Sequence, residues 1–159
     1  MRLSVFRGGF TREAAEVVAG ASLRSLSALV DQSLLRVAAD GRYDVHELLR
    51  QYGKERLLES GEVKRICAAH CGYYASLVAK TNDVSTWGTR SEIEQLEPEI
   101  DNLRLAYDHA IEIRQLNALA DFLWSIKMLH HERGWYQEME DFVAFAFPTG
   151  SFRVVSHHV

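Results

Sequence analysis

A predicted β-hairpin, which lies between helical segments, constrains the fold of this chain more than any other feature of its sequence. Asp40-Gly41 lies between two short alternating runs, 34–37 and 43–45. An Asp-Gly pair flanked by such runs favours a tight turn between antiparallel strands. Leu35 and Val37 would then share one face of the hairpin, because side chains alternate along a strand.

Two helices are predicted ahead of this hairpin. Thr11 is suited to cap the first helix, which would end at Gly20. Ser22 is suited to cap the second, whose apolar residues have the three- and four-residue spacing of one buried face: Leu23, Leu26, Leu29 and Val30. Two helices, a hairpin and a third helix follow the order of a winged helix, which is a helix-turn-helix with an added wing.

From the end of the hairpin onward the sequence predicts only helices. Apolar stripes at helical spacing recur in 46–59, 62–80, 100–111, 116–127 and 135–146. Successive helices with short turns favour antiparallel hairpins of the tetratricopeptide type, although the stripes have no clean repeat period. The predicted fold class is therefore mainly α: a winged-helix domain with a small β-hairpin, followed by tetratricopeptide-like helical hairpins.

These patterns divide the chain into three parts. We expect a winged-helix domain at 1–60, a helical region at 61–148 and a tail without a usable pattern at 149–159. The run Arg2–Phe6 is as apolar as the last turns of a buried helix. A domain seldom starts in mid-core, so we expect the winged helix to be truncated at its N-terminus.

Charge and composition narrow the functional classes. Of the 159 residues, 47% are hydrophobic and 25% charged, as in soluble globular proteins, and the net charge is −4. Duplex-binding domains normally carry a clustered basic face, whereas acidic and basic residues are interleaved here. Arg24 is the only basic residue between Ser22 and Asp31 in the second predicted helix, so major-groove readout of DNA is not favoured.

Motifs for catalysis or metal binding are absent from the sequence. No glycine-rich phosphate loop with a following lysine is present, and no His-Glu-x-x-His or Cys-x-x-Cys motif, so we expect no enzymatic activity. Cys67, His70 and Cys71 share one predicted helix, but two of them fall in its apolar stripe and a fourth ligand is lacking, so no metal is expected. The cysteine spacing does not suit a disulfide, and no signal peptide or membrane span is apparent, which favours the cytoplasm.

His46-Glu47 occupies a special position, where the second predicted strand becomes a helix. Free backbone N–H groups and the positive end of the helix dipole meet there, which suits an anion such as phosphate. In the simpler interpretation, His46 caps its own helix and the dipole favours Glu47. The residues themselves leave both interpretations open.

Several segments resemble the region that follows the nucleotide-binding (NB-ARC) core in STAND-type signalling ATPases. They are Leu3–Phe10, Leu26–Leu35, Tyr43–Tyr52 and Leu96–Arg104, together with His70, Tyr73 and Tyr74. The resemblance covers residues 2–135 and is strongest to the bacterial multidomain transcriptional regulators. It implies a non-catalytic regulatory fragment that couples nucleotide state to a helical-repeat sensor, in a parent protein that is an ATPase.

The resemblance also implies a role for His46. In that family a Met-His-Asp motif ends the winged-helix domain, and its histidine contacts the β-phosphate of bound ADP in the inactive state. Val45-His46-Glu47 matches the motif with two substitutions, and the longer Glu47 alters its hydrogen bonding. His46 and Glu47 are thereby implied to sense the phosphate of ADP or ATP in the parent protein, while this chain alone needs no cofactor.

Partners follow from the same resemblance. The winged helix would pack on the nucleotide-binding core, and the helical region would bind a protein. The apolar face of 135–146 has no following helix to cover it, so self-association is also expected. Neither a membrane nor DNA is expected as a partner. Two alternatives stay open: a stand-alone winged-helix DNA-binding transcriptional regulator, and a helical protein–protein interaction scaffold.

Overall fold

The computed structural model describes residues 1–81, 94–112, 114, 118–119, 121–123, 125–126 and 129. Over these residues the fold is mainly α with one two-stranded antiparallel sheet, as the sequence predicts. The predicted helix at 135–146 and the tail at 149–159 lie outside this part of the chain. No described helix is long and apolar enough to cross a membrane.

Residues 2–45 contain the predicted order of helices and strands. A short 3-10 helix, η1 (Arg2–Val5), leads into α1 (Arg12–Ala19) and α2 (Leu23–Asp31), and the strands β1 (Leu35–Val37) and β2 (Tyr43–Val45) follow. The two predicted caps are confirmed. Thr11 Oγ1 accepts a hydrogen bond from the Ala14 N–H at 3.1 Å, and Ser22 Oγ accepts one from the Ser25 N–H at 3.2 Å.

The hairpin turns at the Asp-Gly pair. The Gly41 N–H donates to the Ala38 carbonyl at 2.9 Å, and Gly41 itself has a φ of 79°, which a glycine adopts at little cost. Across the strands Leu35 pairs with Val45, and Arg36 pairs with Asp44. The N-terminal segment extends this sheet, because Phe10 and Tyr43 exchange two backbone hydrogen bonds of 2.9 Å.

One detail of the predicted burial is wrong. Leu23 was expected on the buried face of the second helix, but it is 48% exposed at the first position of α2. Leu35 and Val37 lie two positions apart in β1 and so on one face of the hairpin, as expected, but Leu35 is 2% exposed and Val37 51%. In the described residues the two-stranded sheet packs on α2 through β1, and the Val37 end of that face lies in solvent.

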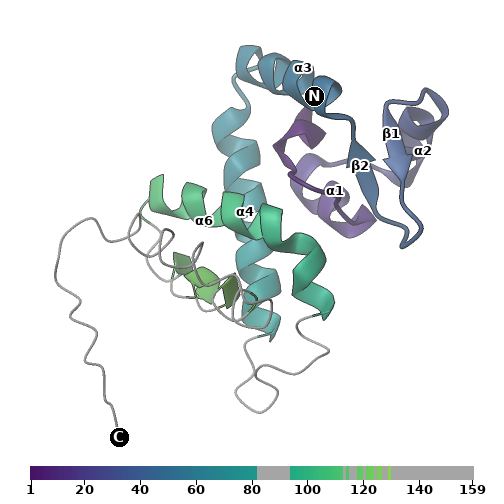
Figure 1. Ribbon diagram of the computed structural model, residues 1–159. Helices are drawn as coiled ribbons and strands as arrows, with labels where there is room; N and C mark the ends of the chain where they lie inside the picture. Colours follow the sequence, from purple (N-terminus) through teal and green to yellow (C-terminus); the bar gives the residue numbers. More distant parts are fainter. Residues whose placement is uncertain are drawn as a thin grey trace, which may run out of the picture.

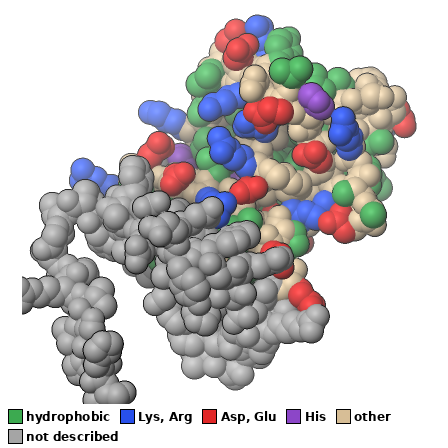
Figure 2. All heavy atoms as spheres, viewed as in Figure 1, with side chains coloured by type: hydrophobic (Ala, Val, Ile, Leu, Met, Phe, Trp, Pro, Cys, Tyr) green, Lys and Arg blue, Asp and Glu red, His purple; other side chains and the backbone are tan. Residues whose placement is uncertain are grey.

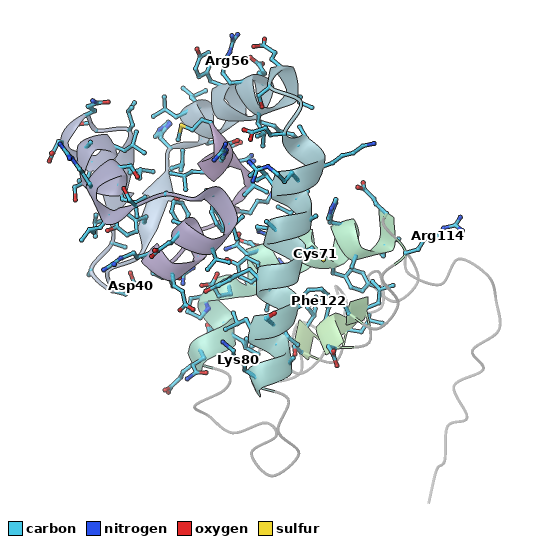
Figure 3. The ribbon with its side chains drawn as sticks, turned by 180° about the vertical axis from the view of Figure 1, so that it is seen from behind. Asp40, Arg56, Cys71, Lys80, Arg114 and Phe122 are labelled. Carbon is cyan, nitrogen blue, oxygen red and sulfur yellow. The ribbon has the colours of Figure 1, made fainter. Side chains whose placement is uncertain are left out.

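Three further α-helices follow in the described part of the chain. They are α3 (Glu47–Glu59), α4 (Val63–Thr81) and α6 (Ile100–Glu112), the last preceded by the 3-10 turn η2 (Glu97–Glu99). The long helix α4 packs on α1 and η1 on one side and on α6 on the other. In both ribbon views α6 crosses α4 (Figures 1 and 3). The helices and strands of residues 2–45 therefore share one core with α4 and α6.

Aromatic rings mark the centre of that core. Phe6 stacks on Phe10 with ring centroids 4.4 Å apart, and His70 of α4 lies against Phe6 and Tyr74 at 5.5 and 4.7 Å. Each of these four residues is at most 2% exposed. The N-terminal segment is thus held against α4 just before it enters the sheet, which fixes the path of residues 7–9 between the two anchors.

Candidate anion-binding site

His46 is the N-cap of α3. Its Nδ1 accepts a hydrogen bond from the Leu48 N–H at 3.4 Å, which confirms the capping interpretation. The residue is exposed, whereas Val45 before it is 8% exposed and anchors the end of β2 in the core. Because the cap uses only Nδ1, the second ring nitrogen, Nε2, is left for another partner.

A cavity of about 580 Å³ opens beside this helix end. Three separate parts of the chain build its walls: the N-terminal segment, the hairpin with the start of α3, and α6. The lining residues are Phe6, Arg7, Gly8, Phe10, Arg36, Asp44, Val45, His46, Glu47, Arg50 and Asp101. His46 and Glu47 therefore lie together in a hollow that also holds three arginines.

Two of these arginines are available to a ligand. No ion pair joins Arg7 or Arg36 to any residue of the described part of the chain, and both residues are exposed. Arg36 lies opposite Asp44 in the strand register. A guanidinium group has a planar fork of N–H donors that matches the oxygens of phosphate or carboxylate.

The third arginine is held by Glu47. Arg50 donates from Nε and Nη2 to the two Glu47 oxygens at 2.8 and 2.7 Å, and Gln51 Nε2 donates to Glu47 Oε1 at 3.0 Å. The hydrogen bonds from Arg50 and Gln51 lower the pKa of Glu47 to about 2, so its carboxylate is ionised throughout the neutral range. Glu47 therefore orients Arg50.

The charges around the cavity nearly cancel. The three arginines face the carboxylates of Asp44, Glu47 and Asp101. Figure 2 shows basic and acidic side chains likewise interleaved over the visible face of the described residues. An anion would thus be held by directed hydrogen bonds and by the dipole of α3, and not by a large positive potential.

The cluster of Cys67, His70 and Cys71 is not arranged as a metal centre. In the described residues, no three His, Cys, Asp or Glu side chains are placed to hold a metal ion. Burial raises the pKa of both thiols, and it lowers the pKa of His70 to about 4. All three groups are therefore neutral at neutral pH, and His70 and Cys71 serve the core of α4, where each is at most 1% exposed.

His46 and Glu47 were predicted from the sequence as site residues, but the other residues that line the cavity were not. The Arg36–Asp44 pairing follows from the hairpin register and could have been predicted from it. Arg7 and Asp101 carried no such signal, because they join the site only when the N-terminal segment and α6 pack together.

Comparison with known proteins gives relatives in one functional class. Three relatives are each named "Putative HTH-type transcriptional regulator", one from Mycobacterium bovis and two from strains of Mycobacterium tuberculosis. Each is 36% identical to this chain over 141 aligned residues, which cover 77% of the chain. The match covers 16% of each relative, so the chain spans a small part of their length. No protein-family model matches the chain, and no solved structure gives a significant match.

The chain is thus similar in sequence to a segment of proteins named as helix-turn-helix transcriptional regulators, and its described part is mainly helical with a β-hairpin after α2.

Proposed function

We propose that this chain is a non-catalytic regulatory segment of a STAND-type transcriptional regulator, and that the cavity at the start of α3 receives a phosphate group of ADP or ATP. The observation that carries this proposal is the position of His46. It caps α3 with Nδ1 and lines the cavity that holds Arg7, Arg36 and Arg50. The nucleotide-binding core of the parent regulator would supply the rest of the nucleotide site.

The chemistry of the cavity supports a phosphate more than other small ligands. The N-terminus of a helix attracts an anion through its dipole and its unpaired N–H groups. Imidazole and guanidinium donors add directed hydrogen bonds to phosphate oxygens. The site has few apolar walls apart from Phe6, Phe10 and Val45, which suits a polar group more than a ring system.

Binding of inorganic pyrophosphate to this chain tests the proposal directly. Pyrophosphate carries the phosphate chemistry of ADP without the base and ribose, for which this chain offers no proposed contact. We expect it to shift the NMR signals of the His46 ring and the Arg7 and Arg36 side chains, and His46→Ala or Arg7→Ala to weaken its binding. Arg24→Ala, on the exposed face of α2, is the matched control and should bind as the unchanged chain does. Pyrophosphate binding that is insensitive to both site variants would contradict the proposal.

The parent protein offers a second test. A phosphate-binding loop of the form Gly-x-x-x-x-Gly-Lys-Ser/Thr is expected upstream of Met1 in the same reading frame. A genomic sequence without such a loop would remove the STAND assignment, although the pyrophosphate experiment would still test the anion site.

DNA binding by this chain itself is the second candidate function. The name of the mycobacterial relatives favours it, as does the order α1, α2 and hairpin, in which α2 takes the place of a recognition helix. Arg24 is the only basic residue of α2, and Asp40 lies at the outer end of the hairpin (Figure 3). A gel-shift series over increasing salt separates the two candidates, because specific duplex binding would weaken steeply with salt. We expect no specific shift.

A further inference from the structure

The loop formed by Arg7, Gly8 and Gly9, here called the pocket loop, is held by side chains from other elements. It joins Phe6 to Phe10, whose rings stack on each other, and two of its residues line the cavity at His46. Gly8 has a φ of 66°, which turns the chain sharply at this point. In the described structure, the hydrogen bonds to the backbone of this loop come only from Asn102 and Arg42.

Asn102, near the start of α6, forms hydrogen bonds to both ends of the pocket loop. Its Oδ1 accepts a hydrogen bond from the Arg7 N–H at 2.8 Å, and its Nδ2 donates to the Gly9 carbonyl at 3.0 Å. The second N–H of the amide donates to Glu99 Oε2 at 3.0 Å. Asn102 is 0% exposed, so water cannot replace these bonds without opening the contact between α6 and the loop.

Glu99 and Arg42 hold the same loop from the hairpin side. Arg42 forms an ion pair with Glu99 through Nη1, and its Nη2 donates to the Gly9 carbonyl at 2.6 Å and to the Pro98 carbonyl at 3.2 Å. Tyr74 of α4 donates to Glu99 Oε2 at 2.9 Å. The first turn of the helical region, the hairpin and α4 thus meet in one buried polar network around the loop.

The neighbour of Asn102 brings α6 into the cavity itself. Asp101 lines the cavity together with His46 at the start of α3. A Cβ built on Gly8 would lie 3.4 Å from Asp101 Oδ2. The pocket loop and α6 therefore touch along the wall of the candidate site, and a shift of α6 would move Arg7 and open that wall.

We propose that Asn102 is a positioning residue through which the helical region controls the anion site. With α6 in place, Asn102 fixes the pocket loop and holds Arg7 at the cavity. A signal or partner that displaces α6 would release the loop and weaken anion binding. By linkage, an anion bound at His46 strengthens the docking of α6 by the same factor. This inference rests on the proposed anion site and adds the route by which that site is regulated.

Pyrophosphate titration of two matched variants tests the coupling. Asn102→Ala removes both bonds to the pocket loop. Tyr74→Phe removes a hydrogen bond from the same buried network but touches no residue of the loop. We expect Asn102→Ala to weaken pyrophosphate binding at least about fivefold, the lower end of typical coupling between sites, and Tyr74→Phe to leave the affinity unchanged. Equal affinity in both folded variants, or equal losses, would overturn the inference.

A second readout does not require the anion. In the anion-free chain, the NMR signals of the His46 ring and the Arg7 amide should change in Asn102→Ala and stay in place in Tyr74→Phe. If the unchanged chain fails to bind pyrophosphate, the proposed function fails. The comparison of anion-free NMR signals then decides by itself whether Asn102 positions the pocket loop. Unchanged His46 and Arg7 signals in Asn102→Ala would overturn the positioning role. Should Asn102→Ala not fold, Asn102→Ser takes its place, since the hydroxyl can still bond to Glu99 but is too short to span the loop.

Discussion

Arg42 in the hairpin loop and Glu99 in η2 form a largely buried ion pair, although 57 positions separate them in the sequence. Their side chains are 14% and 5% exposed. The pair joins the hairpin to η2. Arg42 also donates to the Gly9 and Pro98 carbonyls, and Glu99 also accepts hydrogen bonds from Tyr74 and Asn102. The two predicted domains are therefore joined by a specific polar contact as well as by the apolar core.

The first prediction concerns the stability of this contact. Arg42→Met leaves the carboxylate of Glu99 buried without its counter-charge, and the loss of one partner from a buried pair costs about 3 kcal/mol of unfolding free energy. The double variant Arg42→Met/Glu99→Gln removes both charges, keeps an amide oxygen to accept from Tyr74 and Asn102, and should recover most of that loss. Urea denaturation of the three chains at pH 7 measures both effects. A double variant as unstable as Arg42→Met would show that the charge imbalance is not the cause.

The second prediction concerns His70 and pH. Burial lowers the pKa of His70 to about 4 in the folded chain, against an ordinary value of 6.5. The unfolded chain therefore binds more protons between these values, and the stability that a neutral His70 allows is complete above pH 6.5 and lost as the pH falls toward 4. At pH 4.5 the loss attributable to this residue is about 2 kcal/mol.

The variant His70→Gln isolates that contribution from the carboxylates, which also titrate in acid. Glutamine retains a polar group that can bond to Asn102, the hydrogen-bonding partner of the imidazole, but it does not titrate. Urea denaturation at pH 7 and pH 4.5 should show a smaller fall in unfolding free energy for His70→Gln than for the unchanged chain. Identical falls would mean that His70 does not contribute to acid sensitivity.

Local features of this fold could be predicted from the sequence, because each depends on a few neighbouring residues. The caps at Thr11 and Ser22, the turn at Asp40-Gly41 and the junction of β2 with α3 at His46 all belong to this group. The error at Leu23 has a different origin. Periodicity places Leu23 on an apolar face of the helix, but it does not reveal how far the partner surface extends along that face.

The cavity could be predicted only in part, because it combines local and distant contributions. His46 and Glu47 are adjacent, and their position at a helix start is a local property. Arg7 and Asp101 line the same hollow because the pocket loop packs against α6, where Asn102 bonds to the Arg7 N–H across 95 positions of the sequence. Contacts of this range depend on tertiary packing, which no pattern of nearby residues encodes.

A third prediction concerns the two thiols of α4. Neither cysteine forms a disulfide; Cys67 is partly exposed, and Cys71 is 0% exposed. Burial raises the pKa of both, so thiolate formation is suppressed and Cys71 is also shielded. A thiol-reactive dye should label Cys67 slowly in the native chain and Cys71 only as fast as the protein opens. Cys71→Ala should abolish the slower phase and leave the faster one, and labelling of Cys71 in the native chain at the rate of Cys67 would contradict the packing of α4 on α6.

A fourth prediction concerns Glu47, which the resemblance places beside the phosphate sensor. In the structure its carboxylate is taken up by Arg50 and Gln51. Glu47→Gln should release Arg50 into the cavity and remove one of the three facing carboxylates, so pyrophosphate binding becomes stronger. Glu59→Gln, which breaks a similar ion pair with Arg56 at the far end of α3, is the control and should have no effect. Weaker binding in Glu47→Gln would instead show that the carboxylate contributes to the ligand site.

The last prediction separates the two roles of His46. As an N-cap it stabilises α3, and as a ring with a free Nε2 it is available to an anion. Asparagine is among the best N-cap residues, so His46→Asn should keep the stability of the chain, whereas His46→Ala should cost about 1 kcal/mol. Both variants lack the imidazole, and both should lose the same share of pyrophosphate affinity if Nε2 contacts the phosphate. If His46→Asn binds pyrophosphate as well as histidine does, the site depends on the end of α3 alone, and the phosphate-sensing role of the ring is wrong.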